Sequence, residues 1–353
     1  MSTPASTRLH VLDHWPEPLQ HCSARQLHEH LPGPTLIHLP GRREPALFVS
    51  ILLHGNEYTG LLAVQELLRA HAGALLPRAL SLFIGNVAAA RYGLRRLEHQ
   101  PDYNRIWPGP DDPGTPPATA EHALMRQVYE LMARRGVFAS ADIHNNTGHN
   151  PHYACVNRLE PRFLHLATLF GRTVVYFTHP EGVQSAAFAR LCPAVTLECG
   201  RPGEPEGVAH ARRFLEALLR LSELPHHPVA HGDVDLFHTV AQVKIPPQVS
   251  FGFGRTATDI QFVEDLDRLN FCELPPATCF GRIRRDKPVR LEVRDETGRE
   301  VNDLYFSYDN GEIRTRVPVM PSMLTLDAQI IRQDCLCYLM ERLPLASPAP
   351  DGR

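Results

Sequence analysis

The chain has no long apolar segment. No run of apolar residues approaches the roughly 20 that a membrane-spanning helix requires. The first residues, MSTPASTRLHVLDHWPE, lack the apolar core of a secretory signal. We therefore expect a globular protein that is located in the cytoplasm and has no membrane as a partner.

Neither sign of charge dominates, and the cysteines lack an ordered spacing. Lysine and arginine number 36 and aspartate and glutamate 39, for a formal net charge of −3, which gives no reason to expect nucleic acid as a partner. The eight cysteines are scattered, and the one close pair, Cys335 and Cys337, is not a CxxC motif. This usage indicates free thiols in a reducing compartment.

The region from Ala46 to Leu224 alternates apolar runs with helical patterns. With 353 residues, 43% of them hydrophobic, the chain can bury a substantial core. The apolar runs are continuous rather than alternating, which is typical of strands covered on both faces. We expect an α/β domain with a mixed, mainly parallel sheet flanked by helices. The expected strands are 46–53, 79–86, 137–144, 173–177 and 193–198, and the expected helices are 60–73, 121–136 and 207–224.

The sequence changes character after LPHHPVAHGD, a stretch rich in proline and histidine that is typical of a linker. Short strand-like pieces follow, and DNG at 309–311 between two of them predicts a hairpin. We divide the chain into a catalytic domain at 1–225 and a smaller β-rich domain at 226–345. The tail at 346–353 is expected to be disordered.

Three apolar runs of the first domain end in residues that can bind a metal. ILLH ends at His54 with Glu57 close behind it, ADIH ends at His144, and AVTLE ends at Glu198. Ligands of open α/β sheets bind beyond the carboxyl ends of the strands. Two histidines and one carboxylate with an open fourth position are a common ligand set of hydrolytic zinc sites. Glu198 could then act as a general base on the attacking water.

Each of these residues also has an ordinary interpretation, since an HxxE pattern arises often by chance and the chain has 20 histidines. The metal hypothesis depends on the convergence of several strand ends. His149 and His152 follow the same strand as His144 and are alternative ligands. A cluster of histidines in the linker could bind a second metal, although a solvated linker is the simpler interpretation: His226, His227, His231 and His238.

Four motifs occur in an order that resembles a known family. They are HGNE at 54–57, DYNR at 102–105, DIHN at 142–145 and LECG at 197–200. Together they resemble the succinylglutamate desuccinylase/aspartoacylase branch of the zinc-carboxypeptidase superfamily. The resemblance implies a zinc-carboxypeptidase-like fold and one Zn²⁺ per chain. It assigns the metal ligands to His54, Glu57 and His144, and the water-activating carboxylate to Glu198.

The same resemblance implies roles in substrate binding. Asn104 and Arg105 match a pair that binds the carboxylate of the amino-acid part of the substrate, although an ion pair of Arg105 with Asp102 or another acid is also open. An upstream arginine that polarises the scissile carbonyl would be Arg95 or Arg96, with Arg95 favoured. Asn145 would contact either the substrate or a metal ligand. A second acidic group of the substrate could meet Arg190, which could equally be an ordinary surface arginine.

These features lead to one main functional hypothesis. We expect a zinc-dependent amidohydrolase that removes an acyl group from a small N-acyl amino acid, with Glu198 as general base. Two alternatives stay open: a zinc carboxypeptidase that acts on short peptides, and a metal-binding protein without catalysis. The sequence names neither the acyl group nor the amino acid, and a homo-oligomer remains open.

Overall fold

The computed structural model describes residues 8–109, 117–284 and 286–344. Within these ranges, twelve strands form one large sheet and five form a separate small sheet. The large sheet has the order β1 (His10–Leu12), β2 (Thr35–Leu39), β4 (Leu80–Ile84), β3 (Ala46–Ile51), β5 (Val137–His144), β8 (Ala194–Glu198), β6 (Tyr153–Val156), β7 (Thr173–Tyr176), β9 (Asp235–Lys244), β17 (Cys337–Arg342) and β16 (Met320–Ser322), and β13 (Glu292–Asp295) also pairs with β9. The small sheet has the order β10 (Phe251–Phe253), β11 (Ile260–Phe262), β12 (Cys279–Ile283), β15 (Glu312–Thr315) and β14 (Phe306–Ser307).

Parallel strands form the centre of the large sheet. β3 pairs in parallel with β5, and β5 pairs in parallel with β8. All residues of β3 and β8 are buried, which explains their continuous apolar sequences. Ile51 lies opposite Ile143, and His144 lies opposite Glu198. The three carboxyl ends therefore meet at one edge of the sheet.

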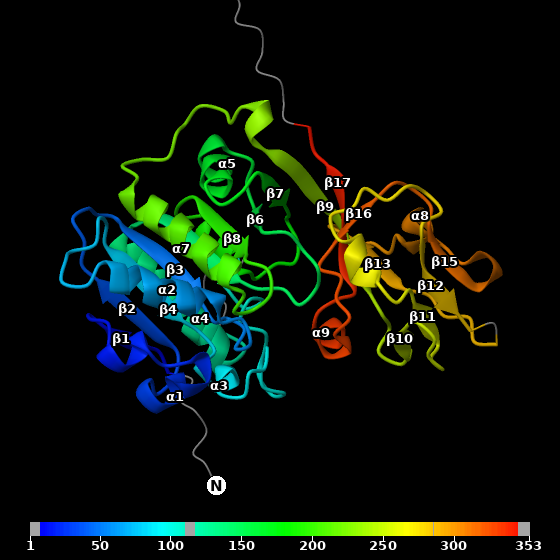
Figure 1. Ribbon diagram of the computed structural model, residues 1–353, viewed down its shortest axis with the longest axis horizontal. Coiled ribbons are helices and arrows are strands. Elements are labelled where there is room, and N and C mark those ends of the chain that lie inside the picture. The colour runs from blue at the N-terminus through cyan, green and yellow to red at the C-terminus, as the bar shows by residue number, and fades with distance from the viewer. Residues whose placement is uncertain (1–7, 110–116, 285, 345–353) are drawn as a thin grey trace, which may run out of the picture.

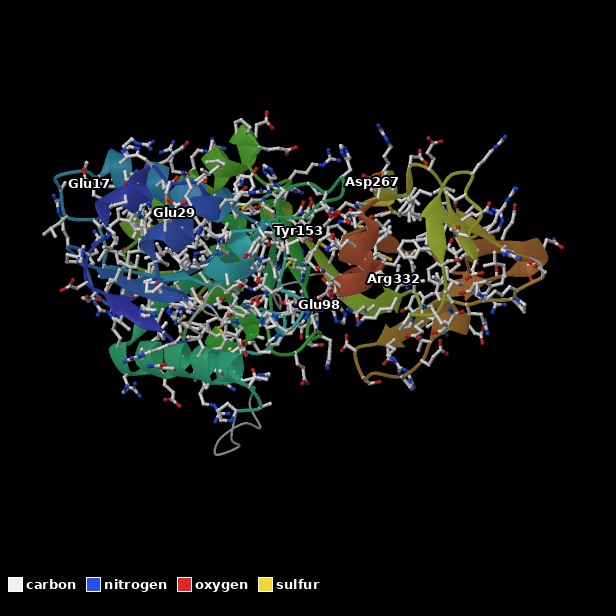
Figure 2. All side chains as sticks on the ribbon, turned by 90° about the horizontal axis from the view of Figure 1, so that it is seen from below. Glu17, Glu29, Glu98, Tyr153, Asp267 and Arg332 are labelled. Atoms are coloured by element: carbon white, nitrogen blue, oxygen red, sulfur yellow. The ribbon has the colours of Figure 1, made fainter. Side chains whose placement is uncertain are left out.

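Helices cover both faces of this sheet (Figures 1 and 2). Helix α6 packs on β5 and β8, where Phe188 stacks on Phe48 of β3 with ring centroids 4.3 Å apart. Helices α2 and α7 pack against each other. None of the helices in the described part of the chain is long and apolar enough to cross a bilayer. The helices are α1 (Leu27–His30), α2 (Thr59–Ala70), α3 (Val87–Ala90), α4 (Ala120–Arg135), α5 (Pro161–Thr168), α6 (Gln184–Phe188), α7 (Pro205–Arg220), α8 (Asn302–Tyr305) and α9 (Ala328–Gln333).

The architecture confirms the predicted fold class, including the smaller β-rich part. The hairpin at 309–311 is also confirmed, because β14 pairs antiparallel with β15 around Asn310 and Gly311, whose φ angles are 55° and 79°. The large sheet, however, continues beyond residue 225, since β9 pairs with β7 and β17 pairs with β9. The division into domains at 225 stays a prediction, and the predicted tail at 346–353 lies outside the described residues.

The C-terminal part contacts the loop that follows β5. A Cβ atom on Gly148 would lie 1.7 Å from the carbonyl oxygen of Leu324, so only glycine fits this close approach. Nearby, the hydroxyl of Tyr153 donates to the sulfur of Met323 at 3.0 Å. Figure 2 shows Tyr153 in the middle of the molecule, between the large layered part and the C-terminal strands.

We predict that Gly148→Ala destabilises the protein. The added methyl group overlaps the backbone of Leu324, and overpacking of this kind costs about 1–3 kcal/mol. The matched control is Gly232→Ala, because a Cβ atom there has no heavy atom within 4 Å. Urea unfolding of both variants checks the expectation. Equal free energies of unfolding for the two would show that the contact between Gly148 and Leu324 is not close in solution.

Candidate metal centre

Three of the predicted residues come together at the edge of the sheet. Leu52 follows β3 with a φ of 55° and turns the chain, and His54 follows two residues later. One ligand atom from each of His54, Glu57 and His144 lies within 4.8 Å of the others. All three residues are buried, with relative exposures of 3–5%. Among the described residues, this is the one group of three or more histidine, cysteine or acidic side chains whose ligand atoms are close enough to hold a metal ion.

The two imidazole rings have the same arrangement of partners. Nδ1 of His54 lies 2.8 Å from one oxygen of Glu57, and Nδ1 of His144 lies 2.7 Å from the other. Nε2 of His54 lies 2.9 Å from Asp102, and Nε2 of His144 lies 2.7 Å from Asp142. Metal-binding histidines commonly donate their second ring N–H to a carboxylate in this way.

This arrangement requires a positive charge. If each Nε2 donates its proton to aspartate, each neutral ring turns an Nδ1 lone pair toward Glu57, which also carries only lone pairs. Burial lowers the pKa of the His144 imidazole, but the Asp142 and Glu57 carboxylates outweigh it and raise that pKa well above its ordinary value. Either a second proton on the rings or a divalent cation supplies the missing charge, so the donor set fits a metal such as Zn²⁺.

Glu198 adds a carboxylate beside this group. It is 7% exposed, lines the same pocket, and its Oε2 is buried without a hydrogen-bond partner among the described residues. Burial raises the pKa of Glu198 to about 7, with the His144 imidazole opposing the rise and the Glu57 carboxylate adding to it. A divalent cation nearby would lower this pKa again.

Two arginines lie in the pocket, and each already has an acidic partner. Arg95 donates from Nε and one terminal nitrogen to Asp102, at 3.1 and 2.9 Å. Arg105 donates to Asp334 at 3.0 Å, and Arg95 reaches the same carboxylate at 3.3 Å. Arg96 instead donates to the carbonyl oxygen of Gln100 at 2.8 Å and does not line the pocket. Of the two upstream candidates, Arg95 is thus the one at the site.

The two predicted asparagines differ in whether their side-chain N–H groups are available to bind a substrate. The side-chain oxygen of Asn104 accepts from the backbone N–H of Gln184 at 2.8 Å, and its nitrogen lies 3.1 Å from Nε2 of His144. If that Nε2 donates to Asp142, the Asn104 amide keeps its N–H groups for the pocket.

Both the oxygen and the nitrogen of the Asn145 side-chain amide already have hydrogen-bond partners. Its side chain bonds to Thr59 and to the carbonyl oxygen of Gly200, and its backbone N–H donates to Glu57 at 3.1 Å. The geometry gives Asn145 a supporting contact to a candidate ligand, while its contact with substrate stays a prediction.

The other histidines considered from the sequence lie elsewhere. His149 is exposed, and His152 packs on His210 with ring centroids 5.1 Å apart. Of the histidines in the predicted linker cluster, His227 packs on His165, and His238 lies in β9 and pairs with Glu296. Neither group joins the cluster around Glu57.

Asp334 is a site residue that the sequence did not indicate. It follows α9 in the C-terminal part and lies between Arg95 and Arg105. No motif surrounds it, and it is more than two hundred residues from its partners in the chain. Burial raises the pKa of Asp334, but the guanidinium groups of Arg105 and Arg95 outweigh it and lower that pKa below its ordinary value.

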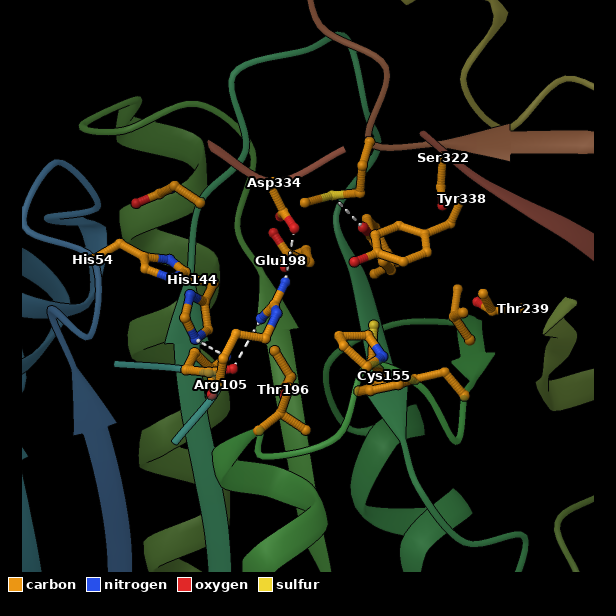
Figure 3. A pocket seen from close by; sticks show the side chains of 18 of the residues that line it. His54, Arg105, His144, Cys155, Thr196, Glu198, Thr239, Ser322, Asp334 and Tyr338 are labelled. Atoms are coloured by element: carbon orange, nitrogen blue, oxygen red, sulfur yellow. Dashed lines mark hydrogen bonds and ion pairs between the residues drawn. The ribbon is translucent and has the colours of Figure 1, made fainter. Parts of the chain in front are cut away.

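The candidate ligands, Glu198, Arg95, Arg105, Asn104, Asn145 and Asp334 line one pocket, whose empty volume of about 680 Å³ includes open solvent. Figure 3 shows His54 and His144 on one side, Arg105, Glu198 and Asp334 in the middle, and Cys155, Thr239, Tyr338 and Ser322 on the opposite side. The pocket is therefore built from strand ends of the large sheet and from residues of the C-terminal part.

Comparison with known proteins identifies the family. The model of the succinylglutamate desuccinylase/aspartoacylase catalytic domain matches residues 44–224, and the chain belongs to this family. The predicted family is thereby confirmed. A comparison with the sequences of curated proteins found no match.

Solved structures share the fold at low sequence identity. A succinylglutamate desuccinylase/aspartoacylase from Rhodobacter sphaeroides is 17% identical, with a TM-score of 0.56 over 88% of this chain and 89% of that one. The succinylglutamate desuccinylase from Chromobacterium violaceum is 16% identical, with a TM-score of 0.53 over 86% and 87%. Murine aminoacylase 3 is 17% identical, with a TM-score of 0.50 over 85% and 97%. Similarity at this level establishes the fold alone.

We predict that Asp334→Asn lowers stability by about 2 kcal/mol at neutral pH. The loss should fall below the roughly 3–5 kcal/mol of a fully buried pair, because Arg95 keeps Asp102 and the Arg105 side chain is 26% exposed. The folded-state pKa is below the ordinary value, so this stabilisation is present above about pH 4 and is lost as the pH falls through the lowered pKa.

Urea unfolding of the metal-free protein at pH 7 and below pH 4 measures the effect. Asp309→Asn, the same change at an exposed turn, is the control and should be within about 0.5 kcal/mol of the original protein. A difference between the two variants that grew as the pH fell would contradict the assigned ion pairs.

Proposed function

We propose that the protein is a zinc-dependent amidohydrolase that removes an acyl group from an N-acyl amino acid. The observation that carries this proposal is that a two-histidine, one-carboxylate donor set shares one pocket with Glu198, whose Oε2 is buried without a hydrogen-bond partner among the described residues. The family is named for a desuccinylase and an aspartoacylase, and the fold relatives include an aminoacylase, which supports a deacylase.

The proposed ligands of one Zn²⁺ per chain are His54, Glu57 and His144. Asp102 and Asp142 would keep the proton on Nε2 of each ring and thereby aim each Nδ1 at the ion. When bound, a zinc ion lowers the pKa of water and stabilises negative charge on a carbonyl oxygen.

Glu198 is the proposed general base. Its free Oε2 would take a proton from the attacking water and deliver it to the amine as the amide bond breaks. Arg95, which lies 3.7 Å from Glu57 as well as beside Asp102, would donate to the carbonyl oxygen as negative charge develops on it.

Arg105 and Asn104 would bind the carboxylate of the amino acid. The Arg105 guanidinium uses one nitrogen on the Asn104 carbonyl and another on Asp334, and its planar fork has further N–H groups. A guanidinium can hold a carboxylate with two parallel hydrogen bonds. Asp334 would fix the orientation of this fork before substrate arrives.

The C-terminal part supports a small substrate rather than a peptide. Ser322, Met323, Asp334 and Tyr338 line the pocket and belong to β16, β17 and the segment between them. Each would shorten the space available along a peptide chain. We therefore favour N-acyl amino acids over the carboxypeptidase alternative, and the retained Glu198 speaks against an inactive metal-binding protein.

We predict that Glu198→Gln lowers kcat on the best N-acyl amino acid by about 10²–10⁴-fold, which is the typical contribution of general acid–base catalysis. Zinc content should be unchanged, because Glu198 is not among the proposed ligands. Glu206→Gln, on the exposed first turn of α7, is the matched control. Undiminished turnover in Glu198→Gln would rule out the proposed role of this carboxylate.

We also predict that the purified protein holds about one zinc ion per chain and that His144→Ala loses it. Elemental analysis of dialysed protein measures the metal-to-chain ratio. His149→Ala removes an exposed imidazole from the following loop and should keep the full metal content. Equal metal content in the two variants would show that the ion binds elsewhere.

A further inference from the structure

The pocket carries more negative than positive charge. Arg95 and Arg105 are the permanent cations among its described lining residues. With a divalent ion bound, the ion and the two guanidinium groups would carry four positive charges. Five carboxylates line the pocket or contact its lining histidines. The five are Glu57, Asp102, Asp142, Glu198 and Asp334.

Both arginines form ion pairs with carboxylates of the protein in the absence of a substrate. Arg95 contacts Asp102 and Asp334, and Arg105 contacts Asp334. One further carboxylate on the fork of Arg105 is compatible with this arrangement, because a guanidinium has five N–H donors. A second carboxylate of the same substrate would need a different cation.

The wall opposite the metal centre consists of uncharged side chains (Figure 3). Polar groups among the uncharged lining residues already have partners: Thr196 donates to Ser185 at 2.9 Å, and the hydroxyl of Tyr338 accepts from Gln242 at 3.1 Å. Burying a charge against such a wall costs several kcal/mol. Figure 3 places Cys155, Thr239, Ser322 and Tyr338 on this side, and the pocket has further uncharged lining residues: Tyr153, Val175, Phe177, Pro180, Val183, Thr196 and Met323.

Three further candidate cations already have partners of their own. His179 lies at the mouth, where its side chain is 48% exposed and pairs with Glu181 at 3.5 Å. The sequence suggested that Arg190 could bind a second acidic group of the substrate. Its guanidinium instead lies 4.9 Å from the centroid of the Tyr129 ring, and it does not line the pocket. Arg294 belongs to a neighbouring surface depression and donates to the carbonyl oxygen of Gly298.

We propose that the pocket selects N-acyl amino acids with a single carboxylate, in which both the acyl group and the amino-acid side chain are uncharged. This inference rests on the proposed deacylase function and narrows its substrate class. N-succinyl groups and the side chains of aspartate and glutamate add a second carboxylate, which Glu198 and Asp334 repel and the opposite wall does not neutralise.

Isosteric substrate pairs test the proposal on the zinc-loaded protein. N-acetyl-asparagine and N-acetyl-aspartate differ in charge and hardly in shape, and so do N-acetyl-glutamine and N-acetyl-glutamate. N-butanoyl and N-succinyl derivatives of one neutral amino acid form a third comparison at equal chain length. We expect kcat/KM to be at least about tenfold higher for the uncharged member of each pair.

The outcomes separate this inference from the function on which it rests. Turnover with equal rates, or with faster cleavage of the charged members, would overturn the inference and leave the deacylase function standing. Failure to cleave any of the compounds would overturn both. Dissociation constants for the same pairs on Glu198→Gln, measured by calorimetry without turnover, should show a preference in the same direction but smaller, because this change removes one of the two repelling carboxylates and leaves Asp334.

A charge added to the wall provides a second test. Thr239 is buried and borders both the pocket and the neighbouring depression, where a longer side chain has room. In Thr239→Arg we expect the ratio of kcat/KM for N-acetyl-aspartate over N-acetyl-asparagine to rise by about tenfold. Thr239→Met adds bulk without charge and should leave the ratio unchanged. A folded Thr239→Arg variant with the original ratio would contradict the role given to this wall.

Discussion

The carboxylate of Glu57 lies between Nδ1 of His54 and Nδ1 of His144, and the remaining contacts of the centre follow from this one. Two buried imidazoles that face a buried carboxylate through their lone pairs repel it unless a positive charge lies among them. Asp102 and Asp142 lie within hydrogen-bond distance of the far nitrogens, and protons on those nitrogens would leave the lone pairs turned toward Glu57. The same aspartates bring further negative charge, which Arg95 partly balances.

The candidate ligands and Glu198 could be predicted from the sequence because local rules fix their positions. Each follows or ends a buried parallel strand, and the ends of such strands meet at one edge of a sheet. The pairing of His144 with Glu198 across β5 and β8 is a direct consequence. Asp334 could not be found in this way, because its contacts with Arg95 and Arg105 depend on how a distant segment packs.

Prediction of the fold from the sequence has a similar limit. Continuous apolar runs predicted β3, β5 and β8, and the DNG sequence predicted the turn at 309–311. The sequence also suggested strands after residue 226 but, apart from this hairpin, not their partners. β9 and β17 add to the large sheet through backbone hydrogen bonds, which carry no side-chain signal. That extension brings Thr239 and Tyr338 to the pocket and completes the uncharged wall.

Anomalous diffraction at the zinc absorption edge tests the central claim most directly. The account predicts one strong peak bonded at about 2 Å to Nδ1 of His54, Nδ1 of His144 and a carboxylate oxygen of Glu57, with both Nε2 atoms still on their aspartates. A zinc peak at other residues, or at these histidines through Nε2, would contradict it. So would crystals grown with zinc that show no peak while both rings still face Glu57.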